Sequence, residues 1–359
     1  VKTILFSEEH FLKGKNIRPQ FPGRNVGLMF GWETSVNPFM QFPAYKEIAD
    51  LPMDQKLEIL KDPLFKQKLL SQEPDFESEI RARLADNPSN KTREEIAQDV
   101  ALPTTITSNY KTQFILGTPP NYEPKEEDSI ASIALRKNIS ELEVMYDEML
   151  KNQGTNLIYA AFTPYEKYKL EFVEQAYRLK SSVAGGSDGG AHCGLICDAS
   201  MPTTNISHWG RDREAGRKFP LEMLIKKQTK DTAETFGLFD RGEIKAGMLA
   251  DINIIDFNKL NVSHPTMIHD LPLGGRRLVQ DATGYVATIK NGQVVSENGK
   301  ANGVLPGKLI RGKQVCEVKT GISKVSLFDK TIRLLAVKVL SFIWRLTGKS
   351  MKTTIVSET

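Results

Sequence analysis

The stretch Val183-Ala-Gly-Gly-Ser-Asp-Gly-Gly-Ala-His192 determines how the rest of the chain is interpreted. A short apolar run leads into one carboxylate, Asp188, which stands among small residues, and His192 follows four positions later. The pattern is typical of a reactive carboxylate at the C-terminal end of a buried parallel strand, because glycines let the backbone turn sharply and let a ligand come close. The alternative is a turn aspartate without a chemical role.

Strand and helix patterns surround this stretch. The apolar runs 25–31 and 156–162 are typical of buried parallel strands. Between the second run and Val183, the residues 165–179 predict a helix with Leu170, Val173 and Tyr177 on one face. The order strand, helix, strand favours βαβ units and a parallel sheet.

The composition is that of a globular protein, with 40% hydrophobic and 26% charged residues among 359. The net charge of +4 is small for this length and gives no case for a nucleic-acid partner. Cys193, Cys197 and Cys316 are too few for a disulfide framework, so we expect a reducing, cytoplasmic compartment. Residues 1–10 match neither a signal nor a transit peptide, and they predict a strand-like start, as if the chain were cut inside a domain.

The segment 46–99 is polar and predicts mostly helix. A helix start is expected at Asp62, which precedes Pro63, and Phe65, Leu69 and Leu70 form an apolar stripe. This pattern predicts a helical excursion over the core, with the role of a lid as one option.

The C-terminal third changes character. A helix is expected over 221–236, ended by Gly237, and the alternation in 251–256 predicts a strand. Residues 285–296 predict a hairpin that turns at Asn291-Gly292, a strong hairpin signal. These strands predict a small β module after the α/β part.

Residues 327–346 predict a basic amphipathic helix in the tail. Three interpretations remain open: docking on a partner or on the body of the protein, contact with a membrane surface, or sequence outside the ancestral domain without a selected role.

Three blocks of sequence together resemble the amidohydrolase superfamily and, within it, the D-aminoacylase (N-acyl-D-amino-acid deacylase) branch. They are Gly186-Ser-Asp-Gly-Gly-Ala-His-Cys-Gly-Leu-Ile-Cys-Asp-Ala-Ser-Met-Pro-Thr203, His208-Trp-Gly-Arg-Asp-Arg213 and Leu238-Phe-Asp-Arg-Gly-Glu-Ile-Lys-Ala-Gly-Met-Leu-Ala-Asp-Ile-Asn-Ile-Ile-Asp256. The runs 25–31, 37–39 and 305–312 also fit this branch, so the resemblance extends over about residues 18–312.

The resemblance implies a (β/α)₈ barrel followed by a β-sandwich, and metal-dependent hydrolysis of carbon–nitrogen bonds other than peptide bonds. Asp188 matches the carboxylate at the end of the last barrel strand, which contacts the metal and carries the proton of the attacking water. The implied cofactor is zinc, and the implied partner is a small N-acyl amino acid. A metal lowers the pKa of bound water toward about 7, and a nearby carboxylate can then accept its proton.

The chain departs from the family pattern at the metal ligands. Family members carry a His-X-His pair on the first barrel strand, and no such pair occurs among the histidines here, which are His10, His192, His208, His264 and His269. A complete barrel takes about 250 residues, and only three or four strand candidates precede Asp188. We therefore expect a partial barrel over 1–246 with a helical insertion at about 46–153, a β-sandwich portion over 247–312, and the tail 313–359.

The remaining candidate residues each have two interpretations. His192 either contacts the substrate or Asp188, or is a structural loop histidine. Arg211 and Arg213 either receive a substrate carboxylate or form salt bridges within a loop. Cys193 and Cys197 are expected to be small buried thiols rather than metal ligands.

Two hypotheses from different classes follow. In the first, the chain is part of a metal-dependent N-acyl-D-amino-acid deacylase in which Asp188 is the acid/base residue. In the second, it is a catalytically incomplete fragment, a pseudoenzyme or a subunit of a split amidohydrolase. It then acts by association, as a homo-oligomer or with a complementing N-terminal polypeptide, because an incomplete barrel leaves open sheet edges.

Overall fold

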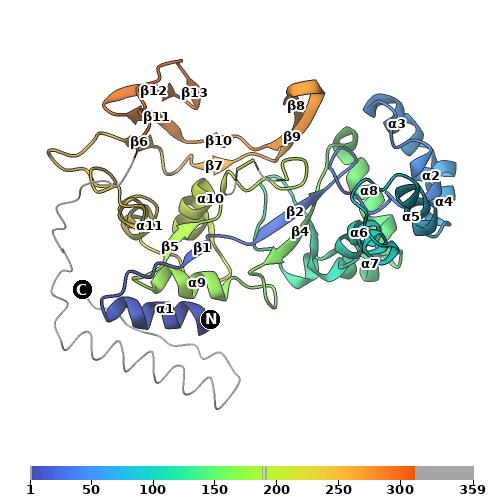
Figure 1. The fold of residues 1–359 in the computed structure, drawn as a ribbon, viewed down its shortest axis with the longest axis horizontal. Coiled ribbons are helices and arrows are strands. Elements are labelled where there is room, and N and C mark those ends of the chain that lie inside the picture. Colours follow the sequence, from blue (N-terminus) through green and yellow to red (C-terminus); the bar gives the residue numbers. More distant parts are fainter. Residues whose placement is uncertain (1, 188, 191, 312–359) are drawn as a thin grey trace, which may run out of the picture.

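The computed structural model describes residues 2–187, 189–190 and 192–311. Asp188 and the predicted tail 313–359 lie outside the described residues. The described chain is a mixed α/β protein, with helices and strands intermixed up to α12 and strands predominating from β6 onward (Figure 1). Within these ranges, no helix has both the length and the apolar character needed to cross a bilayer.

The strand before Asp188 is confirmed. Strand β5 (Val183–Gly185) pairs in parallel with β1 (Gln20–Pro22), and Pro22 aligns with Gly185 at the C-terminal end of both strands. Three helices contact this pair: α9 (Glu171–Arg178), α11 (Leu221–Gln228) and α12 (Lys230–Thr235).

The N-terminal residues form a helix, α1 (Lys2–Leu12), so the prediction of a strand-like start is wrong. Ile4, Ser7 and Glu8 are buried at the three- and four-residue spacing of a helix face. The Glu8 carboxylate accepts a hydrogen bond from the backbone N–H of Ser181 (2.9 Å), just before β5. The apolar run Ile4-Leu5-Phe6 is too short to show a period of its own, so sequence pattern alone could not distinguish a strand from a helix there.

A second sheet has the order β2-β4-β3, and both of its pairings are antiparallel. Its strands are β2 (Val26–Phe30), β3 (Gln113–Ile115) and β4 (Ile158–Thr163). The runs 25–31 and 156–162 are thus strands, but the prediction that they join a parallel sheet is wrong. Their continuous apolar sequence reflects burial on both faces, since Met29 and Phe30 belong to different core clusters, and burial alone does not set strand direction.

The segment 46–99 is helical, as predicted. The side chain of Asp62 caps α4 by accepting a hydrogen bond from the backbone N–H of Leu64 (2.9 Å), and Leu69 on the same helix is fully buried. The larger insertion 46–153 also contains β3, so it is not helical throughout. Its helices and the one that precedes them are α2 (Pro43–Lys46), α3 (Met53–Leu60), α4 (Pro63–Leu70), α5 (Phe76–Ala85), α6 (Arg93–Thr107), α7 (Ile130–Lys137) and α8 (Glu141–Gly154).

Two predicted helices are shorter than expected. The helix expected over 165–179 begins only at Glu171, because Lys167 and Tyr168 have positive φ angles (52° and 57°) that an α-helix cannot contain. Its predicted apolar face, Leu170, Val173 and Tyr177, is buried. The helix expected over 221–236 is divided at Thr229 into α11 and α12.

The C-terminal part is the predicted antiparallel β module. The hairpin of β11 and β12 turns at Asn291-Gly292, where both residues have positive φ (51° and 77°), so this prediction is confirmed. Its strands are β6 (Ile252–Ile255), β7 (Asn261–Val262), β8 (Thr266–Leu271), β9 (Gly275–Val279), β10 (Ala282–Thr283), β11 (Tyr285–Lys290), β12 (Gln293–Glu297) and β13 (Lys300–Ala301).

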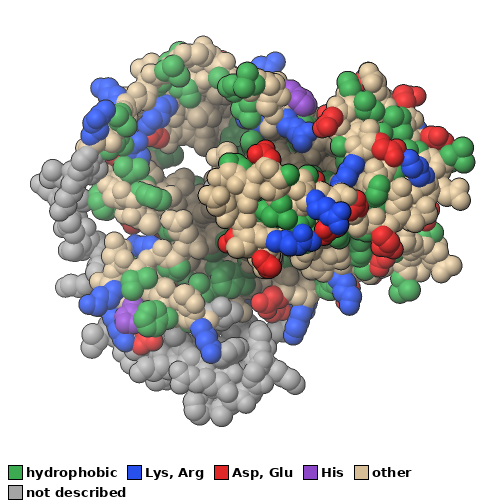
Figure 2. Space-filling model, turned by 45° about the vertical axis from the view of Figure 1, so that its right-hand side comes forward, with side chains coloured by type: hydrophobic (Ala, Val, Ile, Leu, Met, Phe, Trp, Pro, Cys, Tyr) green, Lys and Arg blue, Asp and Glu red, His purple; other side chains and the backbone are tan. Residues whose placement is uncertain are grey.

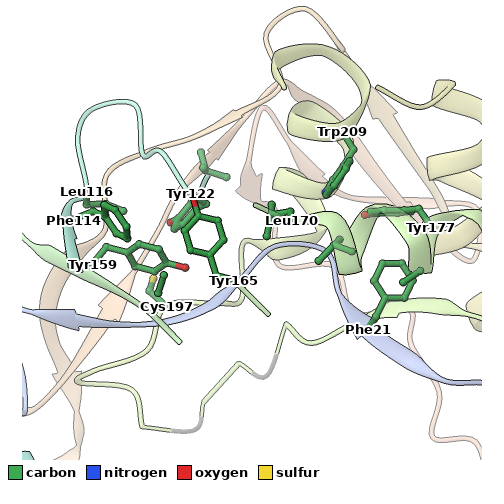
Figure 3. Packing of buried hydrophobic residues seen from close by; sticks show 14 of the residues in the cluster. Phe21, Phe114, Leu116, Tyr122, Tyr159, Tyr165, Leu170, Tyr177, Cys197 and Trp209 are labelled. Carbon is green, nitrogen blue, oxygen red and sulfur yellow. The ribbon is translucent and has the colours of Figure 1, made fainter. Parts of the chain in front are cut away.

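One hydrophobic core joins the β1/β5 region to the β module. Figure 3 shows part of it, with Phe21, Tyr177 and Trp209 in one group and Tyr122 and Tyr159 in another. Val262 and Leu278 of the β module belong to the same cluster. The core therefore crosses the expected boundary at residue 247, and the domain division stays a prediction.

Candidate functional site

The parallel pairing of β1 and β5 places their C-terminal ends at one edge. Gly23, Arg24 and Asn25 follow β1 there, and Gly186 follows β5 and leads toward Asp188. Gly186 has a φ of +85°, and a Cβ atom on it would lie 3.2 Å from Pro22 Cα. Glycine is therefore needed at the turn that leads to Asp188. Ligand sites in sheets with parallel strands lie characteristically at such strand ends.

The segment that follows this turn is held by backbone hydrogen bonds. The carbonyl oxygen of Gly194 accepts from the N–H of Ser35, and that of Leu195 accepts from the N–H of Met29 on β2 (both 2.8 Å). The carbonyl oxygen of Cys193 accepts from the N–H of Leu278 on β9 (2.7 Å). The segment is thus fixed between the second sheet and the β module.

His192 begins this segment. It is exposed and has a φ of +46°, and its carbonyl oxygen accepts hydrogen bonds from the N–H groups of Leu195 and Ile196 (2.7 and 2.9 Å). The backbone of His192 thus closes a tight turn. A contact of its imidazole with a substrate stays a prediction.

A buried ion pair lies at the strand-end edge. Nη2 of Arg24 lies 3.0 Å from Oδ1 of Asp198, and both side chains are almost completely excluded from solvent. The same Nη2 donates to the carbonyl oxygen of Cys197 (3.1 Å), and the guanidinium stacks 3.6 Å from the ring centre of Tyr122. Next to it, the hydroxyl of Tyr159 donates to both the carbonyl and the side-chain oxygen of Asn25.

A second charged cluster surrounds Glu123. Arg213 forms a bidentate ion pair with Glu123, from Nε to Oε2 (3.0 Å) and from Nη2 to Oε1 (3.1 Å), and its Nη1 contacts Oε2 of Glu174 (2.8 Å). Nε2 of His208 lies 2.9 Å from Oε2 of Glu123. Burial alone would raise the pKa of Glu123, but its hydrogen bonds with His208 and Arg213 outweigh burial and bring the pKa below its usual value.

The Arg24–Asp198 pair and the Glu123 cluster are connected through the adjacent residues Tyr122 and Glu123. Tyr122 stacks on Arg24, and Glu123 binds Arg213 and His208. His208 is the first residue of one turn of π-helix, η3 (His208–Asp212), and Arg213 follows its last residue. Such turns are often found at functional sites. The first two sequence blocks of the resemblance are therefore connected in space through Tyr122 and Glu123.

Arg211 and Arg213, the two arginines predicted to bind substrate, have different partners in the structure. Arg213 is buried against Glu123 and Glu174, whereas Arg211 contacts Asp212 and donates to the carbonyl oxygens of Phe257 and Leu260. Both guanidinium groups thus have protein partners in the described structure. Binding of a substrate carboxylate by Arg211 or Arg213 stays a prediction.

Comparison with protein families finds a match in one part of the chain. Residues 170–296 match the model of the amidohydrolase family. This part of the chain resembles an amidohydrolase. The resemblance predicted from the sequence is therefore confirmed for these residues, which we call the amidohydrolase-like region.

Solved structures that match include a D-aminoacylase described as defining a novel subset of amidohydrolases, at 23% identity and a TM-score of 0.30. Another is N-acyl-D-glutamate deacylase from Bordetella bronchiseptica, in complex with zinc and a phosphonate inhibitor, at 18% identity and a TM-score of 0.29. The alignments cover 54% of this chain and 36% and 37% of the solved chains, so this chain spans little more than a third of their length. Among curated proteins, no match was found.

The residues of the site that were not predicted include Arg24, Tyr122, Glu123 and Asp198. Arg24 stands next to the run 25–31 and Asp198 lies inside the first block of the resemblance. A charged residue in or beside these stretches was the signal that could have identified them. Tyr122 and Glu123 gave no such signal, because they belong to a proline-rich loop that lies far along the sequence from their partners Arg24 and Arg213.

A metal site is not formed by the described residues. Within 2–187, 189–190 and 192–311, no three His, Cys, Asp or Glu side chains are grouped so that they could hold a metal ion. Cys193 and Cys197 are both free cysteines. Cys197 is buried, as expected, but Cys193 is partly exposed, so the prediction of a buried thiol is wrong there. The described residues therefore form no zinc site by themselves, and Asp188 lies outside them.

A pocket of about 300 Å³ lies between the second sheet and the β8–β9 hairpin. Glu33 and His264 supply polar groups to its lining, and Trp32, Leu157 and Met267 supply apolar surface. Its volume is at the lower end of the range for small-molecule sites. His192, Arg211 and Arg213 are not among its lining residues.

Proposed function

We propose that this chain acts in the hydrolysis of carbon–nitrogen bonds other than peptide bonds, on an N-acyl amino acid, as in the D-aminoacylase branch. The observation that carries the proposal is the position of the amidohydrolase-like region. Its strand β5 pairs in parallel with β1, and the buried pair of Arg24 and Asp198 lies at the C-terminal end of β1. In the sequence, Asp188 follows β5 by three residues.

Asp188 is the proposed acid/base residue. Its carboxylate takes a proton from a water molecule as the water oxygen attacks the amide carbon. It then returns the proton to the nitrogen as the carbon–nitrogen bond breaks. The products are a carboxylate and a free amine. His192, Arg211 and Arg213 are the proposed substrate-binding residues, with the arginines directed to the substrate carboxylate.

The proposed fold of this region is part of a (β/α)₈ barrel, followed by part of a β-sandwich. Zinc is the metal that the resemblance implies, and it would make hydroxide available at neutral pH. Because the described residues hold no metal group, ligands besides Asp188 would come from outside them.

The test uses the purified chain with zinc added. We expect bound zinc by elemental analysis, and release of free amine from N-acetyl-D-methionine that is lost in the Asp188→Asn variant. The L-enantiomer serves as the matched substrate control. If the wild-type chain holds no zinc and releases amine no faster than the variant, the chain alone is not the enzyme.

Association is the second candidate function. The sheet of β6, β11, β12 and β13 exposes several large apolar side chains, and clustered exposed apolar surface is typical of interaction sites. The most exposed are Ile254, Val286 and Val294. Sedimentation velocity is expected to reveal an oligomer that a Val286→Lys variant weakens. A monomer at all concentrations would exclude self-association.

A further inference from the structure

Arg24 occupies the link between two differently paired strands. Strand β1 ends at Pro22 and pairs in parallel with β5, whereas β2 begins at Val26 and pairs antiparallel with β4. The side chain of Arg24 is completely buried in this link. A charge placed so deeply needs a specific partner, because transfer from water costs several kcal/mol per ion even in real proteins.

The partners of Arg24 come from the far end of the segment that follows Asp188. Its Nη2 group lies 3.0 Å from Asp198 Oδ1 and donates to the carbonyl oxygen of Cys197 (3.1 Å). On the other side of Asp188 in the sequence, Gly186 closely approaches Pro22. Described residues before and after Asp188 are therefore both held near the C-terminal end of β1.

The contacts of Arg24 are unlike those of an optimised structural ion pair. Nε and Nη1 of its guanidinium are buried without a hydrogen-bond partner, and so is Nδ2 of the adjacent Asn25. Buried donors that lack acceptors each cost about 1–3 kcal/mol. An apolar pair of similar volume is often at least as stable as a buried ion pair, so stability alone does not account for Arg24 and Asp198.

We propose that Arg24 is a positioning residue, which through Asp198 and the Cys197 carbonyl holds in place the segment 192–198, the described part of the chain that follows Asp188 in the sequence. The proposal rests on the proposed function for its consequence in catalysis. Arg24 itself contacts no reacting atom. Replacing the pair by apolar residues should leave the fold intact and release the segment.

The test variant is the double substitution Arg24→Met with Asp198→Leu. Amide hydrogen exchange is measured at Met29 and Ser35, whose N–H groups donate to the carbonyl oxygens of Leu195 and Gly194. These two amides therefore report whether the segment stays docked. The amide of Val144, in the other core cluster, is the internal reference.

We expect the double variant to keep the urea midpoint of the wild type, while exchange at Met29 and Ser35 becomes at least about tenfold faster and exchange at Val144 is unchanged. Equal exchange at Met29 and Ser35 in both proteins would overturn the proposal, and so would a uniform acceleration that includes Val144. If the double variant does not fold, the same exchange rates at Met29, Ser35 and Val144 are compared between the wild type and Asp198→Asn, which keeps an oxygen acceptor. The same outcomes support or overturn the proposal.

Enzyme kinetics test the catalytic consequence of the proposal separately. If the wild type hydrolyses N-acetyl-D-methionine, we expect the double variant to lose about tenfold or more in kcat with little change in KM, as for a group that acts only on the transition state. A change in KM alone would contradict a positioning role for Arg24. If the wild type is inactive, the proposed function fails, and the exchange experiment still decides whether Arg24 holds the segment.

Discussion

Arg213 donates two parallel hydrogen bonds to Glu123, from Nε to Oε2 (3.0 Å) and from Nη2 to Oε1 (3.1 Å), and both side chains are buried. This geometry is the strongest form of a carboxylate ion pair. It connects η3 to the loop after β3, across 90 residues of sequence. The pair therefore joins the amidohydrolase-like region to the part of the chain that precedes it.

Removal of Arg213 tests how much this connection contributes. We expect Arg213→Met to lower the free energy of unfolding by about 3–5 kcal/mol, because Glu123 is then buried without its main partner. The measurement is urea denaturation. The matched control is Lys61→Met, which breaks an exposed pair with Glu58 and should cost less than about 1 kcal/mol. Equal losses in the two variants would contradict a buried ion pair at Glu123.

Lys227 makes stability depend on pH. Its ammonium is buried and donates to the carbonyl oxygen of Ser182 (2.6 Å) just before β5, and burial lowers its pKa from 10.5 to about 8. At pH values between about 8 and 10.5, Lys227 is protonated in the unfolded chain but mostly deprotonated in the folded chain. Stability therefore rises with pH from about 8 to 10.5, by roughly 3 kcal/mol from this group.

The comparison that isolates Lys227 is the wild type against Lys227→Met, because other groups titrate in both proteins. Thermal unfolding is followed at several pH values between 7 and 11. The wild type should gain stability relative to the variant as the pH rises. A constant difference between the two proteins would mean that Lys227 keeps an ordinary pKa in the folded state.

Gly292 tests the hairpin without any packing effect. Its φ is +77°, and a Cβ atom built on it meets nothing within 4 Å. We expect Gly292→Ala to cost about 1–2 kcal/mol, since only backbone strain opposes the substitution. Gly292→Asn should cost less, because asparagine tolerates this conformation. Chemical denaturation measures both, and an equal loss for Ala and Asn would exclude backbone strain as the cause.

Local signals predicted local structure. The Asn291-Gly292 turn, the Asp62 cap and the strand before Asp188 were each predicted from a few adjacent residues, and each is present, since turn and cap geometry depend on the side chains at those positions. The predicted start of the helix at Tyr165 was wrong because Lys167 and Tyr168 adopt positive φ angles. Neither residue is a glycine, so the sequence did not indicate this conformation.

The direction of the second sheet and the centre of the site could not be predicted in the same way. The pairing of β2 with β4 depends on how more than a hundred residues of intervening helices fold back. Glu123 is a single carboxylate in a loop, and its partners His208 and Arg213 lie 85 and 90 residues away. Contacts of this range are set by tertiary packing and leave no periodic mark on a single sequence.

Thiol chemistry distinguishes the two cysteines of the first block. Burial raises the pKa of Cys197 to about 11, whereas Cys193 is partly exposed. At pH 8 the pKa of Cys197 leaves only about one thiol in a thousand as the reactive thiolate, and burial blocks access as well. In a Cys316→Ser background, we expect iodoacetamide to modify Cys193 within minutes and to leave Cys197 intact, as read by mass spectrometry of peptides. Both thiols should react after denaturation in urea, and rapid modification of Cys197 in the native protein would show that the segment beside Arg24 opens far more readily than its buried contacts imply.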